Sequence, residues 1–176
     1  MDRFVFLDES STNTTLTPRF ARAPKGARAN DQAPRNYPHN TTLVAAVTPS
    51  GISASMTLPG SLDGLAFGTF VEHVLVPTLQ PGQIVFLDNL SVHKRRACRT
   101  LIENAGCQLH FLPTYSPDLN PIEHIFSKVK GRLRRLSART DEALQAAITD
   151  ALATITSADA THCFIHCGYV VEHQPL

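Results

Sequence analysis

The sequence predicts an α/β fold in which helices flank a mixed five-stranded sheet. Two near-continuous apolar runs, RFVFLD at 3–8 and QIVFLD at 83–88, are typical of strands that are buried on both faces. Between them, TTLVAAVT at 41–48 and ISASMTL at 52–58 flank a Pro-Ser-Gly turn, which indicates a β-hairpin. The first three strands should therefore be antiparallel and consecutive, and parallel strands should follow them.

The rest of the chain predicts helices and one more strand. Helical periodicity runs over 61–77, and a short helix is expected at 92–105. CQLHFL at 107–112 follows as the fifth strand. After the rigid loop PTYSPDLNP, the pattern predicts three helices, at 121–136, 141–156 and 159–167. This order of elements is that of a ribonuclease-H-like core.

A single domain is expected to span 1–176, because this length is enough to bury one sizeable core. Residues 9–40 are rich in Thr, Pro, Arg and Asn and show no periodicity, so we expect a long basic loop, with room for one irregular strand. Residues 157–176 are expected to form a C-terminal extension.

Composition indicates a globular protein without a membrane span. The chain is 43% hydrophobic and 18% charged, and its mean hydropathy is near zero. It lacks a run of about 18 apolar residues, and its N-terminus lacks the basic region and cleavage site of a signal peptide. We therefore expect a cytoplasmic protein whose four cysteines remain thiols.

The basic residues are concentrated in a way that predicts a polyanionic partner. Ten of the 16 Lys and Arg residues lie between Lys94 and Arg139, against three acids, so this stretch carries a net charge of +7. An ordinary solvated helix face is the alternative. The side chains expected to contact DNA are Lys94, Arg95, Arg96, Lys128, Lys130 and Arg134.

Three acids are the candidates for a metal site. Asp8 and Asp88 each end an apolar strand with the same FLD sequence, and functional groups of α/β proteins collect at strand ends. Glu123 falls in the first turn of the helix at 121–136. Carboxylates without Cys or His suit Mg²⁺. The alternatives are a turn or cap role for either Asp, and for Glu123 a capping box with Asn120.

The pattern of the helix at 121–136 favours the metal interpretation of Glu123. Its carboxylate shares one helix face with cations that come later in the helix. This arrangement suits a metal ion at Glu123 and DNA phosphates along the rest of that face. That face carries Glu123, Ser127, Lys130 and Arg134, and the expected buried stripe consists of Ile122, Ile125, Phe126, Val129, Leu133 and Leu136.

These motifs resemble a known family. The segments FLDES, FLDNLSVHK and YSPDLNPIEHIFSKVK are similar to the catalytic domain of DDE transposases of the mariner-like superfamily, on the bacterial insertion-sequence side. The 34 residues between Asp88 and Glu123 match the spacing that is characteristic of that superfamily. The resemblance extends from Arg3 to the FIHCGY segment near the end of the chain.

The resemblance implies a metal-dependent DNA endonuclease and strand-transfer enzyme. Asp8, Asp88 and Glu123 would be catalytic and would bind two Mg²⁺ or Mn²⁺ ions. Asp8 and Asp88 would hold the ion that activates water or a DNA 3′-hydroxyl, and Glu123 would complete the second site. The enzyme would cleave transposon ends and join the 3′-ends to target DNA at a TA dinucleotide. It would act as a homodimer in the bacterial cytoplasm, associated with the nucleoid.

Two departures from the family pattern qualify these expectations. Phe126 stands where relatives commonly have Trp, which is a packing change. Relatives also carry an N-terminal helix-turn-helix region for DNA recognition, which we expect to be absent here because the first strand begins at residue 3. That region would come from a separate or frameshift-fused reading frame. Otherwise the chain would be a non-catalytic DNA-binding or regulatory remnant of a truncated transposase.

Two further groups of residues keep open alternatives. Asn89 and His93 follow the second Asp and are candidates to touch phosphate or orient a ligand, against plain loop and cap roles. A second group has the spacing of paired zinc ligands on a helix, although core packing is favoured there. It consists of His162, Cys163, His166 and Cys167.

Overall fold

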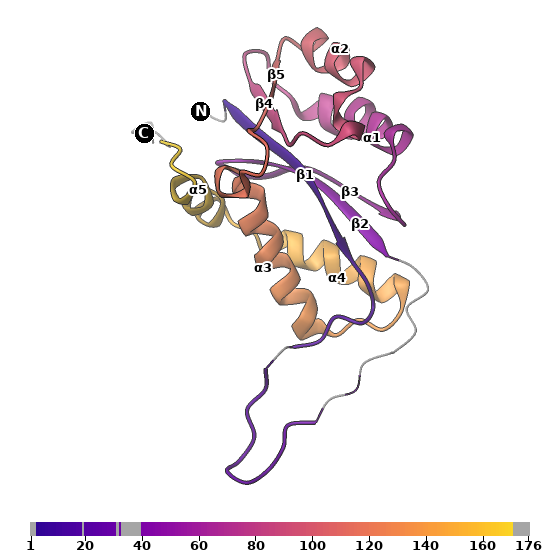
Figure 1. Ribbon diagram of the computed structural model, residues 1–176, viewed down its shortest axis with the longest axis vertical. Coiled ribbons are helices and arrows are strands. Elements are labelled where there is room, and N and C mark those ends of the chain that lie inside the picture. The colour runs from indigo at the N-terminus through magenta and orange to yellow at the C-terminus, as the bar shows by residue number, and fades with distance from the viewer. Residues whose placement is uncertain (1–2, 19, 31, 33–39, 171–176) are drawn as a thin grey trace.

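The computed structural model describes residues 3–18, 20–30, 32 and 40–170. Its centre is a five-stranded sheet with the strand order β3-β2-β1-β4-β5 (Figure 1). The strands are β1 (Phe4–Thr12), β2 (Thr41–Thr48), β3 (Gly51–Pro59), β4 (Ile84–Leu87) and β5 (Gln108–Phe111). β1, β2 and β3 pair antiparallel, whereas β4 is parallel to both β1 and β5. The predicted mixed sheet is thereby confirmed.

The first strand continues four residues beyond its predicted end. Glu9 pairs with Val44 and Thr12 with Thr41, so residues 9–12 belong to the β1–β2 ladder and not to a loop. After Thr12, the described residues up to 32 contain neither helix nor strand. Arg139 fastens the start of this loop, since its guanidinium donates to two backbone carbonyls at 2.9 and 3.1 Å, those of Thr14 and Leu16.

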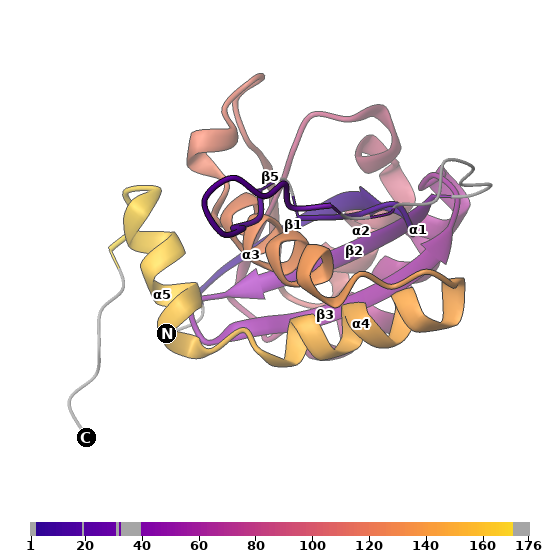
Figure 2. The ribbon, with the colours of Figure 1, turned by 90° about the horizontal axis from the view of Figure 1, so that it is seen from below.

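Two helical layers cover the two faces of the sheet. Figure 2 shows α3 (Pro121–Leu136), α4 (Asp141–Ala153) and α5 (Ser157–His166) gathered on one side. α1 (Gly64–Phe70) and α2 (Arg96–Asn104) cover the other. Side chains alternate along β1, so Phe6 packs with the α3–α5 layer while Val5 and Leu7 pack with the α1–α2 layer. The sheet thus separates two hydrophobic cores.

The predicted helices differ from the observed ones mainly at their ends. The helix expected at 61–77 begins at Gly64, where Asp63 caps it by accepting from two backbone N–H groups, and it continues after α1 as π- and 3₁₀-helical turns to Thr78. The helix expected at 92–105 is divided into a 3₁₀ turn, Ser91–Lys94, and α2. The helix expected to end at residue 156 ends at Ala153.

Leu136 is a correction to the predicted buried stripe of α3. Its side chain is 44% exposed, whereas the other five stripe residues are buried. α3 ends at Leu136, and Ser137 turns the chain away with a left-handed backbone conformation (φ 49°). The last position of the stripe therefore has no sheet to pack against.

The described helices do not include one with the length and apolar character that a bilayer crossing requires. All four cysteines are free thiols, and three of them, Cys98, Cys107 and Cys167, are buried.

Candidate active site

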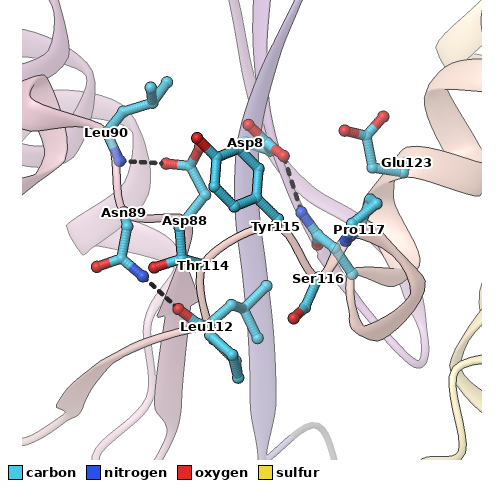
Figure 3. Close-up of a pocket in the computed structure, with 12 residues that line it drawn as sticks. Asp8, Asp88, Asn89, Leu90, Leu112, Thr114, Tyr115, Ser116, Pro117 and Glu123 are labelled. Carbon is cyan, nitrogen blue, oxygen red and sulfur yellow. Dashed lines mark hydrogen bonds between the residues drawn. The ribbon is translucent and has the colours of Figure 1, made fainter.

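The three predicted acids line one cavity of about 360 Å³ (Figure 3). The strand register explains why the two Asp residues meet there. Phe6 of β1 pairs with Phe86 of β4, and the two strands are parallel and adjacent. Asp8 and Asp88 each lie two residues beyond that pair, so they reach the same edge of the sheet. In the view of Figure 3, Asp8 lies between Asp88 and Glu123.

Glu123 comes to the cavity from the first turn of α3, which packs against β1. The capping-box alternative for this residue is wrong. The backbone N–H of Asn120 donates to the carbonyl of Pro117 at 3.0 Å, and α3 has no side-chain cap from Asn120. Glu123 is therefore an exposed carboxylate at the cavity, and its side chain does not cap α3.

Asp8 is the most deeply buried of the three carboxylates, at 8% exposure. Burial raises the pKa of Asp8 to about 7, and the negative charges of Glu9, Asp88 and Glu123 add to this effect. The backbone N–H of Glu9 opposes the rise by donating to Oδ1 of Asp8 at 2.8 Å. Oδ2 accepts a hydrogen bond from Nδ2 of Asn120, also at 2.8 Å.

Asp88 is better stabilised as an anion than Asp8 is. Its Oδ1 atom accepts the backbone N–H of Leu90 at 3.0 Å and lies 2.6 Å from Nδ1 of His93. Burial alone would raise the pKa of Asp88, but His93 and Leu90 together lower it below its ordinary value. Because both contacts use Oδ1, the second oxygen of Asp88 stays available to a ligand.

His93 is buried, at 1% exposure, and therefore does not reach a DNA phosphate in this conformation. Its ring lies against Phe67, and its Nε2 atom lies 3.1 Å from Oε2 of Glu9. Burial would lower the pKa of His93, but the two carboxylates of Asp88 and Glu9 outweigh it and raise this pKa to about 9. Of the two functional roles considered for His93, orienting a ligand is the one compatible with this position.

Asn89 has a structural contact at the cavity wall. Its Nδ2 atom donates to the backbone carbonyl of Leu112, which joins the end of β4 to the segment that follows β5. Both residues line the cavity.

The donor set fits a hard divalent cation, although it is not a closed coordination sphere. Among the described residues, no group of three or more His, Cys, Asp or Glu side chains is gathered tightly enough to hold a metal ion. The cavity nevertheless presents three carboxylates, the oxygen ligands that Mg²⁺ and Mn²⁺ accept. Burial and the neighbouring acids raise the pKa of Asp8, and a bound cation would favour its ionised form.

The predicted DNA-contacting cations fall into two groups. Lys94, Arg95 and Arg96 are exposed and follow Asp88 along the chain, at the end of the 3₁₀ turn and the start of α2. On α3, Lys128 is engaged with Asp159 at 2.5 Å, and this ion pair holds α3 to the first turn of α5. The other two predicted cations of α3, Lys130 and Arg134, are half-buried.

In the group at the C-terminal end, the two cysteines contribute to packing, whereas His162 and His166 are exposed. Cys167 is buried, and Cys163 packs against the core on the α3–α5 side. The ring of His166 lies 4.6 Å from that of His124 in α3.

Three residues at the site have positions that local sequence patterns do not predict. The sequence predicts Glu9 at the start of a loop, Asn120 as a helix cap and Tyr115 within a rigid loop. The structure places Glu9 against His93 and Asn120 against Asp8. Tyr115 lines the cavity with 98% of its side chain exposed and a left-handed backbone (φ 58°). The identical FLD endings predict a site role for Asp8 and Asp88, but no comparable pattern marks Glu9, Asn120 or Tyr115.

Comparisons with known proteins identify the family and the fold. A model of the family described as DDE superfamily endonuclease matches residues 3–145. A comparison with curated proteins gave no match.

Solved structures of Mos1 transposase share the fold. A Mos1 paired-end complex with the left transposon end has a TM-score of 0.76 and 21% identity, over 94% of this chain and 52% of that one. The Mos1 mariner paired-end complex with Mn has a TM-score of 0.78 at the same identity and coverage. The catalytic domain of Mos1 mariner transposase alone gives 0.63 and 18% identity, over 97% and 85%.

The chain spans about half the length of the Mos1 transposase chains in the paired-end complexes that it matches. The likeness confirms the predicted ribonuclease-H-like fold, since the Mos1 catalytic domain has the same mixed sheet with flanking helices. The family match covers most of the chain, from Arg3, just before β1, to Gln145 in α4. The chain therefore belongs to the DDE superfamily endonucleases.

Proposed function

We propose that this chain is a transposase catalytic domain that cleaves transposon-end DNA in a metal-dependent reaction and transfers the 3′-ends into target DNA. The observation that carries the proposal is the meeting of Asp8, Asp88 and Glu123 at one cavity. These acids come from β1, the end of β4 and the start of α3, and they lie within the residues matched by the endonuclease family.

Asp8 and Asp88 are the proposed ligands of a first Mg²⁺ or Mn²⁺ ion, and Glu123 is the proposed ligand of a second. When bound, such ions would activate a water or a DNA 3′-hydroxyl and neutralise charge on the phosphate. The protein's own contribution is orientation. The buried Asp8 is held by two hydrogen bonds, and Asp88 is held through Oδ1. Glu123 is exposed, which leaves it able to adjust to substrate.

DNA is the proposed partner, and two groups of exposed or half-buried cations support it. Lys94, Arg95 and Arg96 lie on the α2 side, whereas Lys130 and Arg134 lie on α3. Both groups are proposed to contact the phosphates of a duplex bound at the cavity. Lys128 has a smaller proposed role, because Asp159 already neutralises it. His93 is proposed to orient Asp88, and Asn89 to fix the cavity wall.

The finer assignments rest on the family resemblance. We place the chain on the bacterial insertion-sequence branch, acting as a homodimer at the nucleoid and inserting at TA dinucleotides. Mos1 structures of the same fold are described as a paired-end complex with a transposon end and as a strand transfer complex, which supports DNA as the partner proposed here.

The test is nicking of a supercoiled plasmid that carries the terminal repeats flanking the gene, in the presence of Mn²⁺. Asp88→Ala should abolish nicking, whereas Glu142→Ala, which removes an exposed acid at the start of α4, should leave it unchanged. Nicking that persists in Asp88→Ala would contradict the proposal. Salt-sensitive DNA binding without any nicking, even when a full-length partner supplies the recognition region, would instead favour a DNA-binding or regulatory remnant.

A further inference from the structure

Asn120 occupies the N-cap position of α3 but does not cap the helix. A capping Asn would accept a hydrogen bond from a backbone N–H of the first turn through its side-chain oxygen. Here that oxygen, Oδ1, is buried and has no hydrogen-bond partner in the described part of the chain. By contrast, the side chains of Asp63, Thr140 and Thr156 do cap α1, α4 and α5. The side chain of Asn120 therefore has another task.

That task is a contact with Asp8, which lies 112 residues away in the chain. Nδ2 of Asn120 donates to Oδ2 of Asp8 at 2.8 Å, and Asn120 itself is only 4% exposed. The other oxygen of Asp8 accepts the backbone N–H of Glu9 at 2.8 Å. Two donors on two different oxygens fix the plane of the carboxylate, which neither donor could do alone.

Asn120 also stands at a rigid point of the chain. Pro121 follows it directly, and Glu123 comes only three residues later. Before it, the 3₁₀ turn Pro117–Leu119 is held by the hydroxyl of Tyr169, which donates to the carbonyl of Leu119 at 2.8 Å. The amide of Asn120 thus ties the start of the helix that carries Glu123 to the strand that carries Asp8.

We propose that Asn120 is a positioning residue of the site, which orients Asp8 and sets the start of α3 relative to it. Oδ1 of Asn120 is buried and has no partner in the described part of the chain, so the side chain makes its hydrogen bond to Asp8 through Nδ2 alone. The importance of Asn120 for DNA cleavage rests on the proposed function. The hydrogen bond to Asp8 and its effect on cation binding can be tested without DNA.

The experiment compares two substitutions that separate positioning from capping. Asn120→Ser keeps a side chain that caps helices well but is too short to reach Asp8. Asn120→Leu keeps the approximate shape and can do neither. Binding of Mn²⁺ to the full chain is followed by the loss of the electron paramagnetic resonance signal of the free ion. We expect both variants to bind Mn²⁺ about tenfold more weakly than the wild type, the size typical of lost support for a metal ligand.

Thr140→Ala serves as the matched control, because Thr140 caps α4 away from the cavity by accepting from the N–H of Ala143. It should lower the melting temperature by about 2–4 °C and leave Mn²⁺ affinity unchanged. If Asn120 were only a cap, Asn120→Ser would match the wild type in both stability and Mn²⁺ affinity. That result would overturn the proposal, as would Mn²⁺ affinity unchanged in Asn120→Leu.

Plasmid nicking then distinguishes this inference from the proposed function. In Asn120→Ser, the Mn²⁺ concentration for half-maximal nicking should rise about tenfold, while the rate at saturating Mn²⁺ stays within about twofold of the wild type. If the wild type never nicks DNA but the variants still bind Mn²⁺ more weakly, the proposed function fails and the role of Asn120 stands. If the wild type nicks and Asn120→Ser shows an unchanged Mn²⁺ dependence, the role of Asn120 fails. A wild-type chain that binds no Mn²⁺ contradicts both.

Discussion

His93 lies between the site and the interior of the protein, with Nδ1 2.6 Å from Oδ1 of Asp88. Its other ring nitrogen faces Glu9 of β1, so one imidazole joins two acidic side chains from neighbouring strands. Asp88 is thereby held from the α1–α2 side of the sheet, where His93 packs on Phe67. The charge on His93 therefore matters both to the fold and to the cavity.

Replacing His93 should destabilise the protein strongly. His93→Gln removes the positive charge between two partly buried carboxylates, and breaking a buried pair of this kind costs about 3–5 kcal/mol. Because the side chain of Asp88 is 37% exposed, we expect a loss at the lower end of that range. The measurement is the free energy of unfolding in urea at pH 7. The control His73→Gln alters a histidine whose side chain is 67% exposed, and a loss of equal size there would contradict the prediction.

The stability of the metal-free protein should fall as the pH rises from about 6.5 to about 9. Folding raises the pKa of His93 to about 9, from about 6.5 in an unfolded chain. The folded state therefore binds this proton more tightly, so the contribution is complete below about pH 6.5 and is lost as the pH rises through about 9. Urea unfolding at several pH values measures this, and in His93→Gln the fall over this interval should be much smaller. An identical pH profile in the two proteins would show that His93 is not the group concerned.

Removing the charge of Asp8 should stabilise the metal-free protein at pH 8. Folding raises the pKa of Asp8 from its ordinary value of 3.8 to about 7, so ionised Asp8 destabilises the fold above pH 7. Asp8→Asn has no charge to bury, and the amide of Asn120 can turn over so that its unused oxygen accepts from the new amide. We expect a gain of about 1–2 kcal/mol in unfolding free energy together with loss of Mn²⁺-induced stabilisation. A less stable variant at pH 8 would refute this account of Asp8.

Tyr115 should be replaceable with a gain in stability. Its backbone is in the left-handed region (φ 58°), where Asn is tolerated better than Tyr, and its ring is 98% exposed. Tyr115→Asn should therefore gain about 0.5–1 kcal/mol in unfolding free energy. Phe20→Asn is the matched control, since Phe20 is 91% exposed and has no positive φ. Equal effects of the two substitutions would exclude backbone strain as the cause.

The basic residues should differ in their weight in DNA binding. Each cation that contacts a phosphate contributes about 0.9 to the slope of log affinity against log salt. Arg95→Ala and Arg96→Ala should each reduce the slope by about 1, because both side chains are exposed. Lys128→Ala should reduce it by less, because Asp159 pairs with Lys128. Fluorescence anisotropy with a random-sequence duplex over a range of salt concentrations measures these slopes. A larger effect for Lys128 than for the two arginines would reverse our assignment.

Local patterns were sufficient to predict the strands of the sheet and the two Asp residues at their ends. The apolar runs before Asp8 and Asp88 identified two central strands, and parallel pairing of such strands carries their ends to one edge. The continuation of β1 could not be predicted in this way. Glu9, Ser10 and Ser11 are polar, and they are in a strand only because β2 lies beside them.

The supporting contacts of the site depend on residues that are distant in sequence. Asn is a residue type that often caps helices, so the sequence around Asn120 predicts a cap. Only the fold brings Asp8 close enough for the side chain of Asn120 to bind it instead. Likewise, the burial of His93 results from packing against Phe67 of α1, which no local periodicity around residue 93 reveals. Tertiary contact therefore decided the roles of residues whose types were ambiguous.

The alternation of side chains along β1 has an evolutionary consequence. Asp8 and Glu9 are consecutive, yet Asp8 contacts Asn120 on the α3 side while Glu9 contacts His93 on the α1–α2 side. Only the pairing of Phe6 with Phe86 decides which acid faces which way. Inserting or deleting one residue between 3 and 8 would move each acid to the opposite face of the sheet, away from its present partner. Length variation in this short segment should thus be tolerated far less than substitution.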